Sequence, residues 1–402
     1  MKVLSRSAFP QFVLHSSRSF CSLARRADAG TLGKCRGARG RLANAASGQK
    51  GPRYVRELWK RWSRIGAGAF SLLTLATSVP GPARAQNVGL CVANAFADQV
   101  ADLIEEHDGA TLIRFGNLPD LVEKVGGCDA VIGAPGGGTD QVLRAGSRLQ
   151  WLQTASAGVE TLLRSDELVA SDVTLTNAKI LQGPEIADHA FGLLLTLTRD
   201  IRFFNAQTSW NRANTLPIIE LRGKTALIIG LGGIGTQIAQ RAAAFEMRVI
   251  AVDPKDIPLS RDVAYVGKPD QLDELLPQAD VVFSSVPHTP ASRGMLGKEQ
   301  FARMKEGVYV VNVSRGPIID TDALVAALRS GKVRAAGLDV TDPEPLPDGH
   351  PLWSMPNVVI TPHIATVSDH SIERRVELFR DNIARFLDNR PLRNVVDKKK
   401  GY

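Results

Sequence analysis

A glycine-rich motif carries the most specific chemical signal in the 402-residue chain. Residues Gly230-Leu231-Gly232-Gly233-Ile234-Gly235 read G-x-G-x-x-G between an apolar run and a helical pattern, and Asp253 ends the next apolar run eighteen residues later. This is the full dinucleotide fingerprint, because the glycines admit a pyrophosphate and the helix N-terminus offers that anion free N–H groups. Asp253 would accept hydrogen bonds from the adenosine ribose and repel a 2′-phosphate, although Lys255 softens this effect. The motif predicts NAD as cofactor, with NADH preferred over NADPH.

Three further polar residues follow apolar runs late in the chain. Arg315 follows one run, Glu344 lies in a proline-rich loop after a second, and His363 follows a third. Ligands of open α/β sheets bind beyond the carboxyl ends of the strands, so we expect the three side chains to converge beside the nicotinamide. Singly, each has an ordinary structural explanation, such as a surface ion pair or a strand cap. Behind a dinucleotide fingerprint, the three together predict a catalytic set.

The elements that must position these residues are short apolar runs that alternate with helical patterns. Such alternation predicts parallel strands with crossover helices, and strands that are apolar throughout indicate helices on both faces of a sheet. We therefore expect an α/β fold with two doubly wound units of similar plan. The expected strands are 88–92, 111–115, 130–132, 149–155, 173–176, 225–229, 248–252, 281–286, 308–313, 335–340 and 358–361, and the expected helices include 98–107, 120–125, 234–245 and 368–387.

The longest helix expected in the middle of the chain covers 185–202. Gly183 and Pro184 open it, since proline is favoured at the first helical position. Its stretch 190–197 is almost wholly apolar. A helix this apolar is buried either in a core or against another subunit.

The charge of the chain is concentrated in its first part. The sequence has 49 basic and 41 acidic residues, of which 1–86 hold 16 and 2, so 87–402 hold 33 and 39 and carry a net −6. The positive net charge of the whole sequence would suggest a nucleic-acid partner, but the negative charge of residues 87–402 excludes that interpretation for this part of the chain. Four cysteines without a C-x-x-C pair are too few for a disulfide scaffold and give no reason to expect a metal.

The first 86 residues are expected to be a leader outside the fold. Residues 1–27 have the Ser- and Arg-rich composition of an organellar transit peptide. A second signal further in resembles a secretory signal peptide that is cleaved before Gln86. It consists of three basic residues, an apolar run over 65–79 and the triplet Ala83-Arg84-Ala85. The run is too short for stable membrane association. As an alternative to a targeting signal, residues 1–86 are a disordered or wrongly assigned extension, and the protein is then expected to be cytoplasmic.

Taken together, the motifs resemble those of the NAD-dependent D-2-hydroxyacid dehydrogenases. The resemblance covers about residues 88–390 of the chain. It rests on G-L-G-x-I-G at 230–235, V-P-H-T-P at 286–290, N-V-S-R-G at 312–316, G-L-D-V-x-x-x-E-P at 337–345 and T-P-H at 361–363.

The resemblance implies a role for each candidate residue. Arg315 would bind the substrate carboxylate and polarise the keto oxygen. His363 would donate a proton to that oxygen, while Glu344 would orient His363 and favour its charged form. Asp339 would contact the nicotinamide side of the cofactor. The remaining cofactor path would be lined by Val286, Pro287, Ser292 and Val313.

A loop earlier in the chain resembles the segment that binds the substrate carboxylate in this family. It reads S-A-G-V-E where many members have G-x-G-x-D. The resemblance implies that the backbone of Ser156, Ala157 and Gly158 faces the substrate, whose identity the loop leaves open. His189 follows Asp188 where Glu-His is commoner, and is interpreted as structural.

The resemblance also implies the domain organisation. A substrate domain would comprise 87–182 plus 366–402, and an NAD-binding domain 183–365, both Rossmann-like with the cleft between them. Members commonly dimerise through the cofactor domain, so the apolar helix is a candidate homodimer contact.

The function predicted is hydride transfer between NAD(H) and a small 2-keto or D-2-hydroxy acid such as glyoxylate or hydroxypyruvate. One alternative is a phosphoglycerate dehydrogenase-like enzyme without the regulatory C-terminal domain found in many such enzymes. A second is an NAD-sensing corepressor-type scaffold, although no low-complexity recruitment tail is visible.

Overall fold

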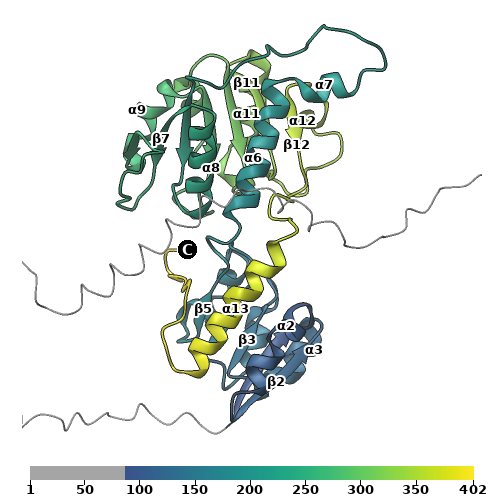
Figure 1. The fold of residues 1–402 in the computed structure, drawn as a ribbon, viewed down its shortest axis with the longest axis vertical. Coiled ribbons are helices and arrows are strands. Elements are labelled where there is room, and N and C mark those ends of the chain that lie inside the picture. The colour runs from purple at the N-terminus through teal and green to yellow at the C-terminus, as the bar shows by residue number, and fades with distance from the viewer. Residues whose placement is uncertain (1–86) are drawn as a thin grey trace, which may run out of the picture. The chain divides into compact units, whose positions relative to one another are not determined.

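The computed structural model describes residues 87–402, so the expectations for the leader lie outside the described residues. The described chain forms two sheets, one of five strands and one of seven, in which every strand pairs in parallel with its neighbours (Figure 1). Helices connect the strands along the chain. The expected α/β class with two parallel sheets is thus confirmed.

The five-stranded sheet has the strand order β2-β1-β3-β4-β5. The C-terminal helix α13 returns to it, and Phe379 of that helix contacts Phe96 of α2 at 5.0 Å between ring centroids. Chain segments far apart in sequence therefore build this unit together. Its elements are β1 Val88–Ala93, α2 Asn94–Glu105, β2 Ala110–Phe115, α3 Leu118–Lys124, β3 Ala130–Ile132, α4 Thr139–Ala145, β4 Trp151–Gln153, α5 Asp166–Ala170, β5 Thr174–Thr176 and α13 Ser371–Leu387.

The seven-stranded sheet has the order β12-β11-β10-β9-β6-β7-β8. Strand β6 lies between β7 and β9, so the chain reverses direction across the sheet at that point, where ligands of such sheets bind. The strands are β6 Thr225–Ile229, β7 Arg248–Val252, β8 Tyr265–Gly267, β9 Val281–Ser284, β10 Val308–Asn312, β11 Val333–Leu338 and β12 Val358–Ile360. The helices are α6 Gly183–Thr198, α7 Ile201–Asn205, α8 Gly233–Ala244, α9 Leu272–Leu275, α10 Lys298–Arg303, α11 Thr321–Ser330 and α12 Pro351–Ser354.

The expected helix 185–202 is wrong at its C-terminal end. Helix α6 ends at Thr198, and Asp200 adopts a left-handed backbone with a φ of 51° before the short helix α7 begins. The buried Asp200 carboxylate accepts hydrogen bonds from the backbone N–H groups of Thr215 at 2.6 Å and Leu216 at 3.2 Å. These long-range hydrogen bonds stabilise the left-handed backbone conformation of Asp200. Aspartate adopts this conformation more readily than most residues do.

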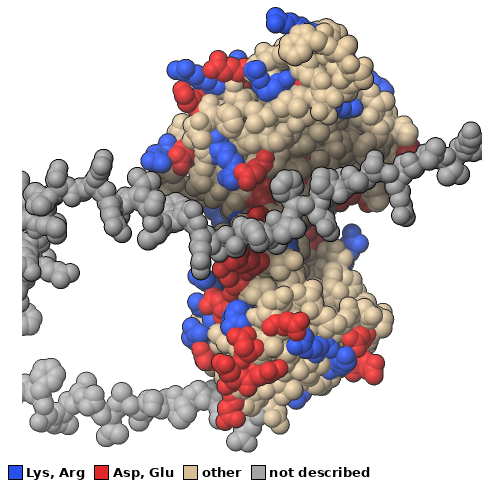
Figure 2. All heavy atoms as spheres, turned by 45° about the vertical axis from the view of Figure 1, so that its right-hand side comes forward, with Lys and Arg blue, Asp and Glu red and all other residues tan. Residues whose placement is uncertain are grey.

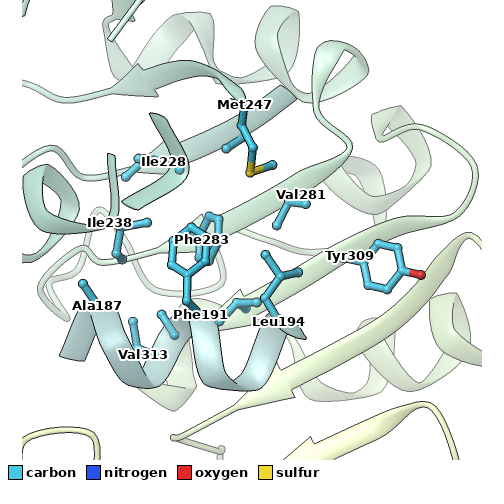
Figure 3. Close-up of a cluster of buried hydrophobic side chains, with 14 of the residues drawn as sticks. Ala187, Phe191, Leu194, Ile228, Ile238, Met247, Val281, Phe283, Tyr309 and Val313 are labelled. Carbon is cyan, nitrogen blue, oxygen red and sulfur yellow. The ribbon is translucent and has the colours of Figure 1, made fainter. Parts of the chain in front are cut away.

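The apolar face of α6 packs within its own chain. Phe191 stacks against Phe283 of β9 with 5.4 Å between ring centroids, and Leu194 lies in the same cluster of buried side chains (Figure 3). A Cβ atom on Gly337 of β11 would lie 2.8 Å from the Cβ of Leu193, so glycine permits the close crossing of helix and strand. Contacts within this core therefore explain why the stretch 190–197 is apolar, and no contact with a second subunit is needed to explain it.

One disulfide bond lies in the core of the five-stranded unit. It joins Cys91 of β1 to Cys128, just before β3, and both residues are fully buried. The bond links two neighbouring strands from the inside. The sequence analysis did not anticipate this pair, because the number and spacing of the cysteines do not show which side chains lie together.

Removing this crosslink is expected to lower the free energy of unfolding. The bond closes a sequence separation of 37 residues, which corresponds to about 3–4 kcal/mol in a chain-entropy treatment. Urea unfolding of the Cys91→Ala/Cys128→Ala variant, compared with the unmutated protein with and without reductant, measures this. Equal unfolding midpoints under all three conditions would show that the two thiols are not bonded in solution.

The surface of the described chain carries mixed charge. On the face shown in Figure 2, basic and acidic side chains are interspersed, as the 33 basic and 39 acidic residues of 87–402 lead one to expect. Within these residues, no helix is both long enough and apolar enough to cross a membrane.

Candidate active site

Arg315 is held in place where strand β10 ends. The Asn312 side chain donates to the Arg315 carbonyl at 3.0 Å and accepts from the backbone N–H of Ser314 at 3.1 Å, so the turn is tied together from within. A Cβ on Gly316 would lie 1.8 Å from the Thr341 carbonyl oxygen. Only glycine therefore lets the Arg315 segment pack against the loop that leads to Glu344.

His363 and Glu344 form the expected pair. Nδ1 of His363 lies 2.6 Å from Oε1 of Glu344, with side chains 37% and 42% exposed. His363 has a left-handed φ of 53°, and its backbone N–H donates to the Asp339 carbonyl at 2.8 Å. An uncommon conformation of this kind, fixed by neighbouring groups, is typical of catalytic loops. The contact at Nδ1 leaves Nε2 as the ring nitrogen available to a ligand.

Asp339 organises the loop that carries His363. Its carboxylate is almost fully buried and accepts hydrogen bonds from the Thr361 hydroxyl at 2.6 Å and from the backbone N–H groups of Ile364 and Ala365 at 3.0 Å each. Burial raises the pKa of Asp339, but the hydrogen bonds, with His189 first among them, outweigh burial and hold this pKa below its ordinary value. Asp339 is therefore charged, and fixes the backbone on both sides of His363.

His189 reaches this network from helix α6. Its Nε2 lies 2.8 Å from the Thr361 hydroxyl and 3.4 Å from Oδ1 of Asp339. These contacts agree with the structural role expected for His189.

The expected substrate loop lies against Arg315. Oε1 of Glu160 is 3.1 Å from Nε of Arg315, and Nη1 of Arg315 donates to the Ser314 carbonyl at 2.7 Å. A Cβ on Gly158 would lie 1.9 Å from Nη2 of Arg315, so the loop backbone touches the guanidinium. Ser156, which is exposed, accepts from the Gly158 N–H at 3.2 Å, and Ala157 accepts from the Asn177 side chain at 2.7 Å.

The glycine motif connects β6 to α8 as expected. Gly230 has a φ of 91°, and a Cβ on Gly235 would lie 1.9 Å from the Gly230 carbonyl oxygen, so both positions require glycine. Gly233 packs on Ile180, while Ile234 packs against the core cluster. In contrast, a Cβ on Gly232 would meet nothing within 4 Å. Open space at the N-terminus of a 12-residue helix fits a pyrophosphate.

Asp253 closes the other side of this loop. It is 7% exposed, and its two carboxylate oxygens accept from the N–H groups of Leu231 at 2.8 Å and Lys255 at 2.9 Å. Each oxygen retains a further lone pair, so ribose hydroxyls can still donate to it. A hollow of about 310 Å³ opens beside Lys255.

The other expected cofactor residues differ in their surroundings. Val286 lies beside the glycine loop, because its Cγ1 is 2.8 Å from a Cβ placed on Gly230. Pro287 is exposed, whereas Val313 is buried in the core cluster. The buried Ser292 donates to the Pro287 carbonyl at 2.7 Å, so its hydroxyl shapes the loop.

The predicted residues thus form two connected groups. Glu344, His363 and Asp339 belong to one network, and Arg315 belongs to the second with the 156–158 loop. Within residues 87–402, no hydrogen bond or ion pair links Arg315 directly to His363, and no cluster of acidic, histidine and cysteine side chains could hold a metal ion. Sequence reasoning missed Glu160, whose only signal was its place in the S-A-G-V-E segment.

Comparisons with known proteins show which proteins this chain is similar to. Residues 191–365 match the family model described as D-isomer specific 2-hydroxyacid dehydrogenase, NAD binding domain. The D-3-phosphoglycerate dehydrogenase of Archaeoglobus fulgidus is 33% identical over 313 residues, which cover 76% of this chain and 58% of that protein. The hydroxypyruvate reductase of Blautia hydrogenotrophica is 43% identical over 184 residues, which cover 45% of this chain and 56% of that protein.

A solved structure extends the likeness to nearly the whole described chain. A D-isomer specific 2-hydroxyacid dehydrogenase family protein from Aeromonas salmonicida superimposes with a TM-score of 0.68 at 31% identity, covering 78% of this chain and 100% of that one. This chain spans less than two thirds of each of the two curated relatives.

Proposed function

Because this chain belongs to the D-isomer specific 2-hydroxyacid dehydrogenase family, we propose that it reduces a small 2-keto acid, such as glyoxylate or hydroxypyruvate, to the D-2-hydroxy acid with NADH. The observation that carries the proposal is the 2.6 Å pair of His363 and Glu344 beside the segment of Arg315. The direct test is oxidation of NADH in the presence of such an acid.

Arg315 holds the substrate in this proposal. Its guanidinium touches the 156–158 loop, whose backbone N–H groups can share the substrate carboxylate with it. A planar guanidinium that binds the carboxylate also polarises the adjacent keto oxygen. The substrate is thereby oriented with its keto carbon toward the space above the glycine loop.

His363 supplies the proton. Glu344 accepts at Nδ1, which directs the other ring nitrogen, Nε2, to the keto oxygen as a donor. A bound NADH supplies the hydride that C2 of the substrate accepts. Asp339 keeps His363 at its position through the backbone bonds described above, and we retain the expectation that it also faces the nicotinamide.

Two alternatives remain distinct from this proposal. A phosphoglycerate dehydrogenase-like activity is favoured by the name of one relative, and would require a site that accepts a phosphate on the substrate. A NAD-sensing scaffold would bind the cofactor without turnover. Activity with unphosphorylated 2-keto acids separates the proposed enzyme from both.

The geometry at Asp253 supports NADH as the preferred cofactor. A 2′-phosphate would meet the Asp253 carboxylate, whereas Lys268, a basic residue near the hollow, is committed to Asp256 at 2.7 Å. Within residues 87–402, Lys255 forms no such ion pair with a carboxylate. Its ammonium lies 5.3 Å from the centre of the Tyr402 ring, and it weakens the preference for NADH over NADPH.

Replacing Asp253 by alanine is therefore expected to raise the KM for NADH and narrow its advantage over NADPH. One lost hydrogen-bonding carboxylate corresponds to about 1.5–3 kcal/mol, or about 10- to 100-fold in KM. Initial rates with both cofactors measure this, with Glu299→Ala as the control at an exposed carboxylate of α10. Equal kcat/KM for NADH and NADPH in the unmutated protein would contradict the proposed preference.

The domain boundaries at 87–182 plus 366–402 and at 183–365 stay our proposal, as does a homodimer through the cofactor domain. Helix α6 is occupied by its own core, so support for the dimer comes from the exposed apolar side chains around the segment that follows it. Of these, Trp210 is 93%, Ile201 49% and Ile218 45% exposed. A targeting role for residues 1–86 also remains a proposal.

A further inference from the structure

Arg315 already has a carboxylate partner in this structure. Glu160 lies 3.1 Å from its Nε, and the two side chains are 27% and 28% exposed. Within the described residues, no other basic side chain lies within ion-pair distance of Glu160. The contact therefore joins the substrate-binding arginine to a charged group of the protein itself.

The position of this carboxylate is the informative feature. A Cβ placed on Gly158 would lie 1.9 Å from Nη2 of Arg315 and 2.4 Å from Oε2 of Glu160. Both charged groups thus touch the loop whose backbone is expected to hold the substrate carboxylate. Nη1 is bonded to the Ser314 carbonyl at 2.7 Å, whereas Glu160 contacts Nε, on the Nε and Nη2 edge of the guanidinium that faces Gly158. That edge is the fork a substrate carboxylate would use.

We propose that Glu160 is an internal competitor of the substrate: its carboxylate occupies Arg315 in the free protein and is displaced when a 2-keto acid binds. The inference rests on the proposed function for the identity of the ligand. After it is displaced, the Glu160 carboxylate stays close to the bound acid, because Glu160 belongs to the same short loop. A second negative group on the substrate is then repelled, whereas a singly charged acid replaces one carboxylate by another. Glu160 in this way selects singly charged 2-keto acids.

A positioning role for Glu160 would give the opposite result. If the contact at Nε served to orient Arg315 for catalysis, neutralising Glu160 would weaken substrate binding and lower kcat together. If Glu160 competes, neutralising it strengthens the binding of carboxylates. A partly exposed ion pair stabilises by up to about 1 kcal/mol, so the expected gain in affinity is about two- to fivefold.

The test compares Glu160→Gln and Glu160→Ala with the unmutated protein and with Glu167→Gln. Glu167 is a matched control, because it forms an ion pair with Arg144 at 3.3 Å in the same unit, with side chains 42% and 73% exposed. Calorimetry in the presence of NADH gives the Kd of oxamate, an unreactive 2-keto acid analogue. Steady-state kinetics give kcat and KM separately for glyoxylate and for 3-phosphohydroxypyruvate.

Competition predicts that both Glu160 variants lower the Kd of oxamate and the KM of glyoxylate by about two- to fivefold without loss of kcat. The KM of the phosphorylated acid should fall further, and Glu167→Gln should change nothing. An unchanged or raised oxamate Kd in both variants would overturn the inference, as would the absence of oxamate binding in every protein. If the unmutated protein binds oxamate but reduces no acid, the proposed function fails, and the Kd comparison still decides whether Glu160 competes.

Discussion

Replacing Arg315 by lysine is expected to lower kcat/KM for a 2-keto acid by about 10²–10³, because one charged hydrogen bond to the transition state contributes about 2–4 kcal/mol. Lysine keeps the positive charge but loses the planar fork, so it cannot both bind the carboxylate in two places and polarise the keto oxygen. The Arg315 guanidinium also donates to the Ser314 carbonyl at 2.7 Å, a contact that fixes its plane. Initial rates over a range of substrate concentrations measure the loss.

Arg144→Lys is the matched control for this variant, since Arg144 is an exposed arginine on α4 that also pairs with a glutamate, Glu167 at 3.3 Å. It should retain unmutated kinetics. Thermal unfolding of both variants checks that the fold is intact. A kcat/KM for Arg315→Lys within threefold of the unmutated value would remove Arg315 from the substrate site.

Replacing Glu344 by glutamine is expected to lower kcat/KM for reduction by about tenfold or more. Oε1 of Glu344 lies 2.6 Å from Nδ1 of His363, so the carboxylate orients the ring with Nε2 directed to the keto oxygen. Glutamine keeps a hydrogen-bonding shape but removes the charge that makes this hydrogen bond strong. The expected loss is part of the factor of about 10²–10⁴ that general acid catalysis contributes. Initial rates of NADH oxidation with a 2-keto acid measure it.

Glu373→Gln is the matched control for the Glu344 variant, because Oε2 of Glu373 lies 3.0 Å from Nδ1 of His370 in an exposed pair. This control should retain unmutated kinetics. Thermal unfolding of both variants checks that the fold is intact. If kcat/KM of Glu344→Gln stays within threefold of the unmutated value, Glu344 is not the functional partner of His363.

The parts of the site that were predictable are those in which short-range sequence determines the geometry. Gly230 and Gly235 are required by the backbone itself, through a positive φ and a close approach, so they appear in the sequence as a fixed spacing. Asp253 and Arg315 directly follow apolar strands, and parallel strands bring their carboxyl ends to one edge of a sheet. His363 and Glu344 were paired by family resemblance, and the structure brings them into contact.

The parts that were not predictable depend on contacts between distant segments. The end of helix α6 at Thr198 is set by hydrogen bonds that the Asp200 carboxylate accepts from the backbone N–H groups of residues 215 and 216, and neither glycine nor proline marks it locally. Strand β8, Tyr265–Gly267, lies at the edge of the sheet with only Gly267 buried, so it has no apolar run that could reveal it. The contact of Glu160 with Arg315 spans 155 residues of chain, and no local spacing encodes it.

The most direct test of the proposed function follows NADH absorbance with a panel of 2-keto acids. Glyoxylate, hydroxypyruvate, pyruvate and 3-phosphohydroxypyruvate are each supplied with NADH or NADPH to the unmutated protein and to Arg315→Lys. We expect NADH absorbance to fall with at least one of the small unphosphorylated acids. This loss should be faster than the loss with NADPH and strongly reduced in the Arg315 variant. Bound NADH without turnover of any acid would contradict it and favour the scaffold, and turnover of the phosphorylated acid alone would favour the phosphoglycerate dehydrogenase-like alternative.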